Sequence, residues 1–149
     1  MQDYHEPMSV HEYDASRELM IRLGHDADLV QSLAELARSK GIEAGSFTAI
    51  GALKSARLGY YDQRGEKYRE TRVNSACELA SCTGNISLKD GVPFAHIHVV
   101  LADETGNIKA GHLFEGIVFA AEVHLRQLDG PKLERRYDEA TDLSLWKVE

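Results

Sequence analysis

The sequence predicts an α+β domain, in which one main helix packs on a mainly antiparallel (mixed) sheet of about six to eight strands. Two observations lead to this class. Only residues 26–40 carry a clear helical repeat of apolar side chains, whereas most other segments alternate apolar and polar residues, as strands do. The turns between the alternating segments are too short for the crossovers that parallel strands require, so neighbouring strands are expected to run antiparallel.

The predicted helix spans residues 26–40. Its apolar residues recur at helical spacing and form one stripe, namely Leu29, Val30, Leu33, Leu36 and Ala37. Asp26 is the predicted N-cap, with Asp28 in the first turn, and Gly41 is the predicted C-terminal stop. Because an apolar stripe needs a surface to cover, we interpret this helix as scaffold for the sheet.

The strands are predicted from residues that alternate between two faces. A first strand covers residues 17–24, and Leu19, Ile21 and Leu23 share its apolar face. The later segments predicted as strands are 42–51, which is rich in small residues, the alternating 52–62, the polar 66–73, and then 76–88, 94–101, 108–114, 116–125 and 132–137. A bulge is predicted at Gly84–Asn85. For 116–125 the predicted core face comprises Ile117, Phe119, Ala121, Val123 and Leu125.

The chain is expected to form one domain at residues 16–149, preceded by a polar N-terminal arm at residues 1–15. Apolar residues make up 43% of the 149 residues, which is enough for a sizeable core. No apolar run approaches the roughly 20 residues that span a membrane, and no basic start followed by an apolar stretch marks a secretory signal. We therefore expect a cytoplasmic protein with no membrane partner.

The net charge of −7 bears on nucleic-acid binding. DNA affinity comes largely from Lys and Arg side chains that neutralise phosphates. The densest basic segments, 64–72 and 132–136, are interleaved with Asp or Glu, and we interpret them as solvated strand faces or turns. Direct DNA binding is therefore not favoured, and a protein or small-molecule partner is the better expectation.

Two cysteines, Cys77 and Cys82, lie five positions apart on one predicted strand. At that spacing they would face opposite sides of the strand and could not form a local disulfide. They match no zinc-finger or redox spacing, so we expect reduced, at least partly buried thiols.

Three of the seven histidines fall in one predicted hairpin. His96 and His98 are two apart and share a strand face. If the arms 94–101 and 108–114 turn near Thr105–Gly106, His112 lies roughly opposite His98. Three imidazoles so placed could hold a transition metal and leave a coordination position open, in a catalytic, structural or regulatory site. The alternative is a polar packing or interface cluster without metal.

Metal-bound histidines usually need hydrogen-bond partners that fix their tautomers. Four acidic residues are candidates by residue type alone, namely Glu78, Asp103, Glu115 and Glu122. Neither Ser81 nor Cys82 has the sequence context of a nucleophile.

Several segments together resemble the PPC domain, the "plants and prokaryotes conserved" domain. They are 45–53 (GSFTAIGAL), 58–62 (LGYYD), 78–86 (ELASCTGNI), 93–98 (PFAHIH) and 111–113 (GHL). The resemblance covers roughly residues 17–137 and implies an α+β domain that forms a homotrimer. Plant relatives carry a preceding AT-hook, an Arg-Gly-Arg-Pro element for the DNA minor groove. This sequence has none, and it resembles the stand-alone prokaryotic form.

The same resemblance implies a metal on the motif histidines, which here are His96, His98 and His112. A divalent transition metal is expected, and zinc is the first expectation. Ala110 departs from the pattern, since a second glycine often precedes Gly-His-Leu.

Two functions follow as hypotheses. The first is a DNA-associated or regulatory binding protein with a His-bound metal. The second is a metal-dependent hydrolase or lyase that uses an open three-His site.

Overall fold

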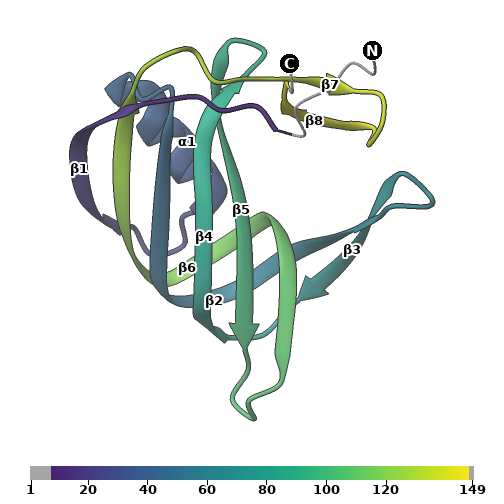
Figure 1. Ribbon diagram of the computed structural model, residues 1–149. Helices are drawn as coiled ribbons and strands as arrows, with labels where there is room; N and C mark the ends of the chain where they lie inside the picture. The colour runs from purple at the N-terminus through teal and green to yellow at the C-terminus, as the bar shows by residue number, and fades with distance from the viewer. Residues whose placement is uncertain (1–7, 148–149) are drawn as a thin grey trace.

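The computed structural model describes residues 8–147, and in that range it contains one helix and one eight-stranded sheet (Figure 1). The elements are β1 (Asp14–Leu23), α1 (Leu29–Lys40), β2 (Gly45–Asp62), β3 (Lys67–Val73), β4 (Cys77–Lys89), β5 (Val92–Ala102), β6 (Ile108–Asp129), β7 (Glu134–Asp138) and β8 (Leu143–Trp146). All strand pairs are antiparallel except β4 with β7. The predicted α+β class with a mainly antiparallel, mixed sheet is confirmed.

The sheet follows the order β3-β2-β6-β5-β4-β7-β8, with β1 added beside β6. β2 also pairs with β4, so strands β2, β6, β5 and β4 close on one another around the core. α1 packs against β5 and β6. In Figure 1 the helix lies at the opposite side of the view from the β7–β8 and β2–β3 hairpins. No helix within the described residues has the length and apolar character needed to cross a membrane.

One side of β5 faces the core, and the other side carries His96 and His98 and is called the histidine face. Its buried residues are Ala95, Ile97, Val99 and Leu101. His96 and His98 occupy the alternate positions, so the period of a strand turns both away from the core. The core side of β5 is therefore apolar and packed against α1, and its other side is free to carry the polar site.

β6 differs from its predicted core face in its first half. Ala121, Val123 and Leu125 are buried as predicted, but Phe119 is 59% exposed and Val118 is fully buried. The prediction of Ile117 and Phe119 as core residues is wrong because the β2–β6 register shifts between Ala52 and Leu53, which pair with Ala120 and Val118. This bulge leaves Phe119 without a partner in β2 and shifts the alternation of the residues before it, so Val118 rather than Ile117 faces the core.

A second bulge corrects two predictions for β4. The β4–β5 register shifts between Leu79 and Ser81, whereas Gly84–Asn85 pair regularly with the neighbouring strand. The extra residue brings Cys82 to the same core cluster as Cys77, so the two cysteines do not face opposite sides. Both are buried free thiols, as predicted, and burial raises the pKa of Cys82 to about 12.

The helix starts at Leu29, with Asp28 rather than Asp26 as N-cap. The Asp28 carboxylate accepts hydrogen bonds from Val30 N and from Gly116 N in β6, both at 3.1 Å. The prediction of Asp26 as the cap is wrong because tertiary contacts decide which aspartate caps the helix. Asp26 adopts a positive φ and its carboxylate binds Lys54. The predicted stop is confirmed, since Gly41 is left-handed at φ 66°.

Replacing Asp28 with alanine is expected to lower the free energy of unfolding by about 1–2 kcal/mol, because the helix loses its cap and Gly116 N loses its acceptor. Urea unfolding followed by circular dichroism measures this. Asp26→Ala is the matched control, because that carboxylate is exposed and caps nothing. Equal destabilisation by the two substitutions would contradict the assignment of the cap.

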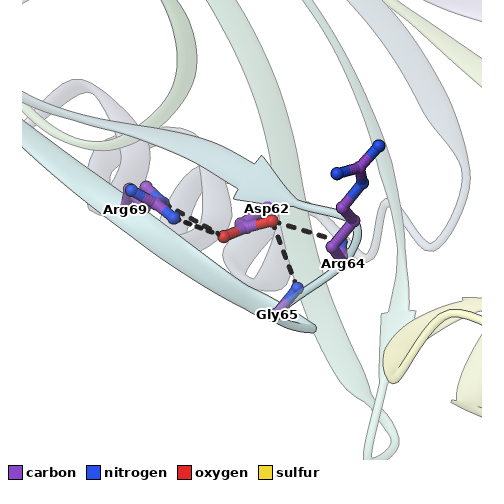
Figure 2. Close-up of polar contacts among 4 residues, drawn as sticks. All are labelled: Asp62, Arg64, Gly65 and Arg69. Atoms are coloured by element: carbon purple, nitrogen blue, oxygen red, sulfur yellow. Dashed lines mark hydrogen bonds and ion pairs between the residues drawn. The ribbon is translucent and has the colours of Figure 1, made fainter.

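The β2–β3 hairpin ends in a turn that Asp62 organises. Figure 2 shows its carboxylate accepting hydrogen bonds from Arg64 N and Gly65 N, both at 3.1 Å, and pairing with Arg69 at 2.7 Å. An aspartate that binds the backbone two and three residues ahead fixes a tight turn. The predicted strands 52–62 and 66–73 therefore form a hairpin, and its returning strand brings Tyr68 beside His112.

Two terminal segments differ from the expected outline. β1 begins at Asp14, inside the predicted arm, and Leu19, Ile21 and Leu23 share its packed face as predicted. Residues 143–146, which are weakly patterned, form β8 and pair with β7. Residues 1–7 of the arm, and residues 148–149 at the other end, lie outside the described residues.

Candidate metal and ligand site

The β5–β6 hairpin brings His96, His98 and His112 together. His98 and His112 are direct cross-strand partners, as the sequence predicts. One ring nitrogen from each of the three histidines lies within 4.8 Å of the other two. The ring centroids are 5.1 to 5.7 Å apart. The cluster is therefore compact enough for one small ion to reach all three rings.

His112 carries the polar atom that most needs a partner. Its Nδ1 is buried and makes no hydrogen bond within the described chain. Leaving a buried polar nitrogen unpaired costs about 1–3 kcal/mol. The His112 ring is held in place by Phe114 and Tyr68, whose ring centroids lie 4.7 and 5.3 Å away. Neutral imidazole nitrogens held in this way are the donors that zinc and related metals accept, so the residues fit a metal.

Glycine is required where β6 enters the site. Gly111 has φ 154°, and a Cβ there would lie 2.6 Å from the carbonyl oxygen of Gly59 in β2. A Cβ on Gly59 would in turn lie 2.5 Å from the ring of Phe114. The two glycines let β2 and β6 approach closely, and this approach fixes the backbone on which His112 is mounted. The close approach occurs with Ala110 as the residue before Gly111.

Burial keeps two of the histidines neutral. It lowers the pKa of His96 to about 4, with further lowering by Arg135, His112 and His98. Burial likewise lowers the pKa of His112 to about 4, with contributions from His98 and Arg135. Both imidazoles are therefore uncharged near neutral pH and have lone pairs free to bind a metal.

The metal-free protein is expected to lose stability as the pH falls from 6.5 toward 4. The pKa values of His96 and His112 are lower in the folded chain than the ordinary value of 6.5, so protonation favours the unfolded chain. The contribution of the two neutral histidines to the free energy of unfolding is complete above pH 6.5 and is lost as the pH falls through 4. Urea midpoints measured in chelator across this range should fall less steeply for His112→Asn than for the wild type. His11→Asn, at an exposed histidine that forms no ion pair in the described structure, is the control and should keep the wild-type slope.

A cavity of about 240 Å³ lies beside the cluster. It is lined by Tyr68, Lys89, Phe94, His96, His112, Phe114, Arg135, Leu143, Ser144 and Leu145. The cavity is built from β3, β4, β5, β6, β7 and β8, so strands far apart in the sequence contribute to it. His98 is more exposed and is absent from the lining. Two of the three histidines thus face a shared, partly enclosed space.

Arg135 is the principal residue that the sequence analysis missed. It lies in a basic segment interpreted as solvated, yet it is only 7% exposed, and for this residue that interpretation is wrong. Its Nη2 lies 3.4 Å from His96 Nδ1. One signal was available in the sequence, since Arg135 lies two positions after Leu133, which is also buried. The short parallel pairing of β7 with β4 carries Arg135 to the site.

The four acidic candidates do not serve the histidines in the described structure. None of Glu78, Asp103, Glu115 and Glu122 joins the cluster of metal-ligand groups. Asp103 instead organises its own turn, accepting hydrogen bonds from Thr105 N and Asn107 N at 2.9 Å. The nearest polar partner of the cluster is therefore cationic Arg135, and no carboxylate takes that place.

The fold and the site define a class of protein, a one-helix α+β domain whose three-histidine group has metal-ligand spacing and opens onto a cavity. The chain belongs to the Plants and Prokaryotes Conserved (PCC, or PPC) domain family, whose model matches residues 10–129. The family resemblance inferred from the sequence is thereby confirmed.

Solved structures share the fold over nearly the whole chain. The metal-containing protein AF0104 from Archaeoglobus fulgidus is 42% identical, with a TM-score of 0.91, covering 94% of this chain and 99% of that one. A PPC protein from Pyrococcus horikoshii is 36% identical, with a TM-score of 0.90, covering 94% and 97%. A protein from Ralstonia eutropha, named as a candidate DNA-binding protein, is 27% identical, with a TM-score of 0.77, covering 87% and 90%.

Curated relatives place a similar sequence inside a much larger protein. The bifunctional protein GlmU of Synechococcus sp. (strain JA-2-3B'a(2-13)) is 32% identical over 124 residues, which is 81% of this chain. GlmU from a second Synechococcus strain, JA-3-3Ab, matches at the same identity and length. The chain spans only about a fifth of the length of these relatives, 18% and 19%.

Proposed function

We propose that this chain is a metal-binding regulatory domain, in which His96, His98 and His112 hold a divalent transition metal and the adjoining cavity receives a ligand. The observation that carries the proposal is the convergence of three ring nitrogens within 4.8 Å, one ring having a buried nitrogen without a hydrogen-bond partner. Zinc is the first expectation because it accepts three imidazoles readily. The metal-containing relative at 42% identity supports the same assignment.

A polar packing cluster explains the histidines less well. Such a cluster would be stabilised by hydrogen bonds among its members, whereas His112 Nδ1 has none in the described structure. The close approach of His96 to the Arg135 guanidinium is also unfavourable for any protonated imidazole. Three ring nitrogens that lie within 4.8 Å of one another are better satisfied by a shared cation.

Metal-dependent hydrolysis or lyase chemistry is the second candidate function. It is favoured by the cavity, which contacts His96 and His112 directly. A bound metal would supply Lewis-acid activation there. Against this candidate, the described cavity lining includes no Asp or Glu to act as a general base. The lining thus supports ligand binding better than hydrolysis.

Elemental analysis of tag-free protein tests the metal assignment. About one transition-metal ion per chain is expected in the wild type, and His96→Ala and His98→Ala should each lose it. His124→Ala is the matched control, because His124 is an exposed histidine that binds Glu18 on the same sheet. Metal-free wild-type protein that also fails to take up zinc in equilibrium dialysis would overturn the proposal.

We further propose a homotrimer, as the family resemblance implies. The outer face of the β1–β6–β2 region supports association, because Met20 is 79% and Ile50 66% exposed there, near exposed Phe119. Large exposed apolar side chains commonly mark contact surfaces. Light scattering should give three times the 16.6 kDa chain mass. Ile50→Asp should reduce this mass, whereas Val92→Asp, exposed elsewhere, should not. A monomeric wild type would refute the trimer.

A protein or small-molecule partner fits the acidic chain better than DNA. Fluorescence anisotropy on a nonspecific duplex tests the DNA-associated alternative, and the net charge of −7 predicts no binding even at low salt. Binding that weakens steeply with added salt would instead support a direct role on DNA.

A further inference from the structure

We propose that the cavity beside the histidine cluster is an anion-binding pocket that takes a small monocarboxylate with an apolar body. The inference deepens the proposed function and rests on it for the role of the cavity, but its evidence is separate from the histidines. It stands on the two cations that line the cavity, on the absence of an acidic partner for them in the described structure, and on the aromatic walls.

The two cations gather around one aromatic ring. Lys89 Nζ lies 5.1 Å and the Arg135 guanidinium carbon 5.4 Å from the centroid of the Phe94 ring. Both side chains line the cavity, and among the described residues neither takes part in an ion pair with Asp or Glu. In a chain with 24 acidic and 17 basic residues, this concentration of unpaired positive charge marks a place for an anion.

Arg135 is a buried charge without a counter-ion in the described chain. Its Nε donates to Ser87 Oγ at 2.9 Å, its Nη2 to Asn85 Oδ1 at 3.0 Å and its Nη1 to the Ser144 carbonyl at 3.2 Å. All three acceptors are neutral. Hydrogen bonds to neutral groups orient a guanidinium but leave its charge uncompensated, and buried charges are normally paired. An anionic ligand in the adjoining cavity would supply the missing charge.

The hydrogen-bond inventory of Arg135 limits the kind of anion. A guanidinium has five N–H donors; three of those on Arg135 are used by these acceptors, and Nη2 also lies 3.4 Å from His96 Nδ1, a longer and weaker contact. At most two remain, which suits the two oxygens of one carboxylate. A phosphate presents more oxygens and more charge than two donors and Lys89 would satisfy. A carboxylate is therefore the anion that this set of donors matches.

The remaining walls specify an apolar body. Phe94, Phe114 and Tyr68 contribute rings to the lining, and Leu143 and Leu145 close it from β8. The cavity volume of about 240 Å³ lies below the range of about 300–1,000 Å³ usual for larger ligands. The expected ligand is thus a small aryl or branched-alkyl carboxylate, with its charged end at Arg135 and Lys89 and its apolar end among the rings.

Isothermal titration calorimetry on the full chain, as purified and after chelation, tests the pocket with benzoate and 3-methylbutanoate as probes. Benzamide, which has the shape of benzoate without its charge, should bind at least about tenfold more weakly. Lys89→Met and Arg135→Met should each weaken benzoate binding, by about three- to tenfold and by more than about tenfold respectively. Arg136→Met, an exposed neighbour of Arg135, should leave it unchanged.

The outcomes separate the pocket from the metal. Arg135→Met is compared with the wild type only where circular dichroism shows that the variant is folded. Lys89→Met provides a second test at a less buried residue. Variants that keep the metal and lose benzoate would support the pocket alone. Metal-loaded protein that binds no carboxylate would overturn the pocket and leave the metal assignment standing. Equal binding of benzamide, unchanged benzoate affinity in both variants, or tighter binding of inorganic phosphate would also overturn the proposal.

Discussion

Zinc is expected to raise the unfolding midpoint of the metal-free protein, and the His112→Asn variant is expected to lose most of that increase. The physical reason is linkage, because three converging imidazoles exist only in the folded chain and a ligand of the folded state stabilises it. When free zinc exceeds its dissociation constant about 1,000-fold, the gain is about 4 kcal/mol. Urea unfolding at a series of buffered zinc concentrations measures it.

The change produced by zinc is the informative quantity, because His112→Asn also alters packing against Phe114 and Tyr68. His124→Asn keeps the three clustered rings and should show the full zinc-dependent increase. An equal increase in His112→Asn and wild type would show that zinc binds elsewhere. No increase in the wild type would contradict the metal assignment itself.

Gly111→Ala is expected to be strongly destabilising, by about 3 kcal/mol or more. An alanine would have to adopt φ 154°, and its Cβ would lie 2.6 Å from the carbonyl oxygen of Gly59. That neighbour is backbone in a paired strand, so relief requires β2 and β6 to separate. Because His112 follows directly, the separation should also weaken zinc binding. Urea unfolding and zinc titration of the same variant measure both effects.

Gly106→Ala is the matched control for Gly111→Ala. Gly106 also has a positive φ, at 81°, but a Cβ there meets nothing within 4 Å. Its substitution therefore carries the cost of backbone conformation without the steric clash, about 1 kcal/mol. The difference between the free energies of unfolding of the two variants measures the cost of the steric clash between β2 and β6. If both lose the same stability, the clash is relieved cheaply and the close approach does not constrain His112.

The sequence predicted the histidine hairpin well because the information needed is local. A strand repeats every two residues, so His96 and His98 must share a face, and a short turn sets which residue lies opposite His98. The burial of Ile97 between the two histidines follows from the same alternation. The amphipathic stripe of α1 and its stop at Gly41 were likewise readable from spacing and residue type.

The wrong predictions fall where an extra residue or a distant contact intervenes. The bulge at Phe119 reverses the alternation of β6, and the bulge between Leu79 and Ser81 brings Cys82 into the core. Strand periodicity gives no sign of either, because a bulge is fixed by pairing with the neighbouring strand. The helix cap moved to Asp28 for a similar reason, since Gly116 in β6 binds the same carboxylate.

The sequence by itself determined the fold class, the family and the three histidines that share one face. Only the tertiary structure decided what surrounds them. Arg135 reaches His96 across 39 positions of sequence, through the pairing of β7 with β4. The position of Arg135 two residues after Leu133 is too weak a signal to mark its charge as buried, because burial depends on which distant strands cover it. The cationic, aromatic cavity beside the histidines is therefore a property of strand assembly.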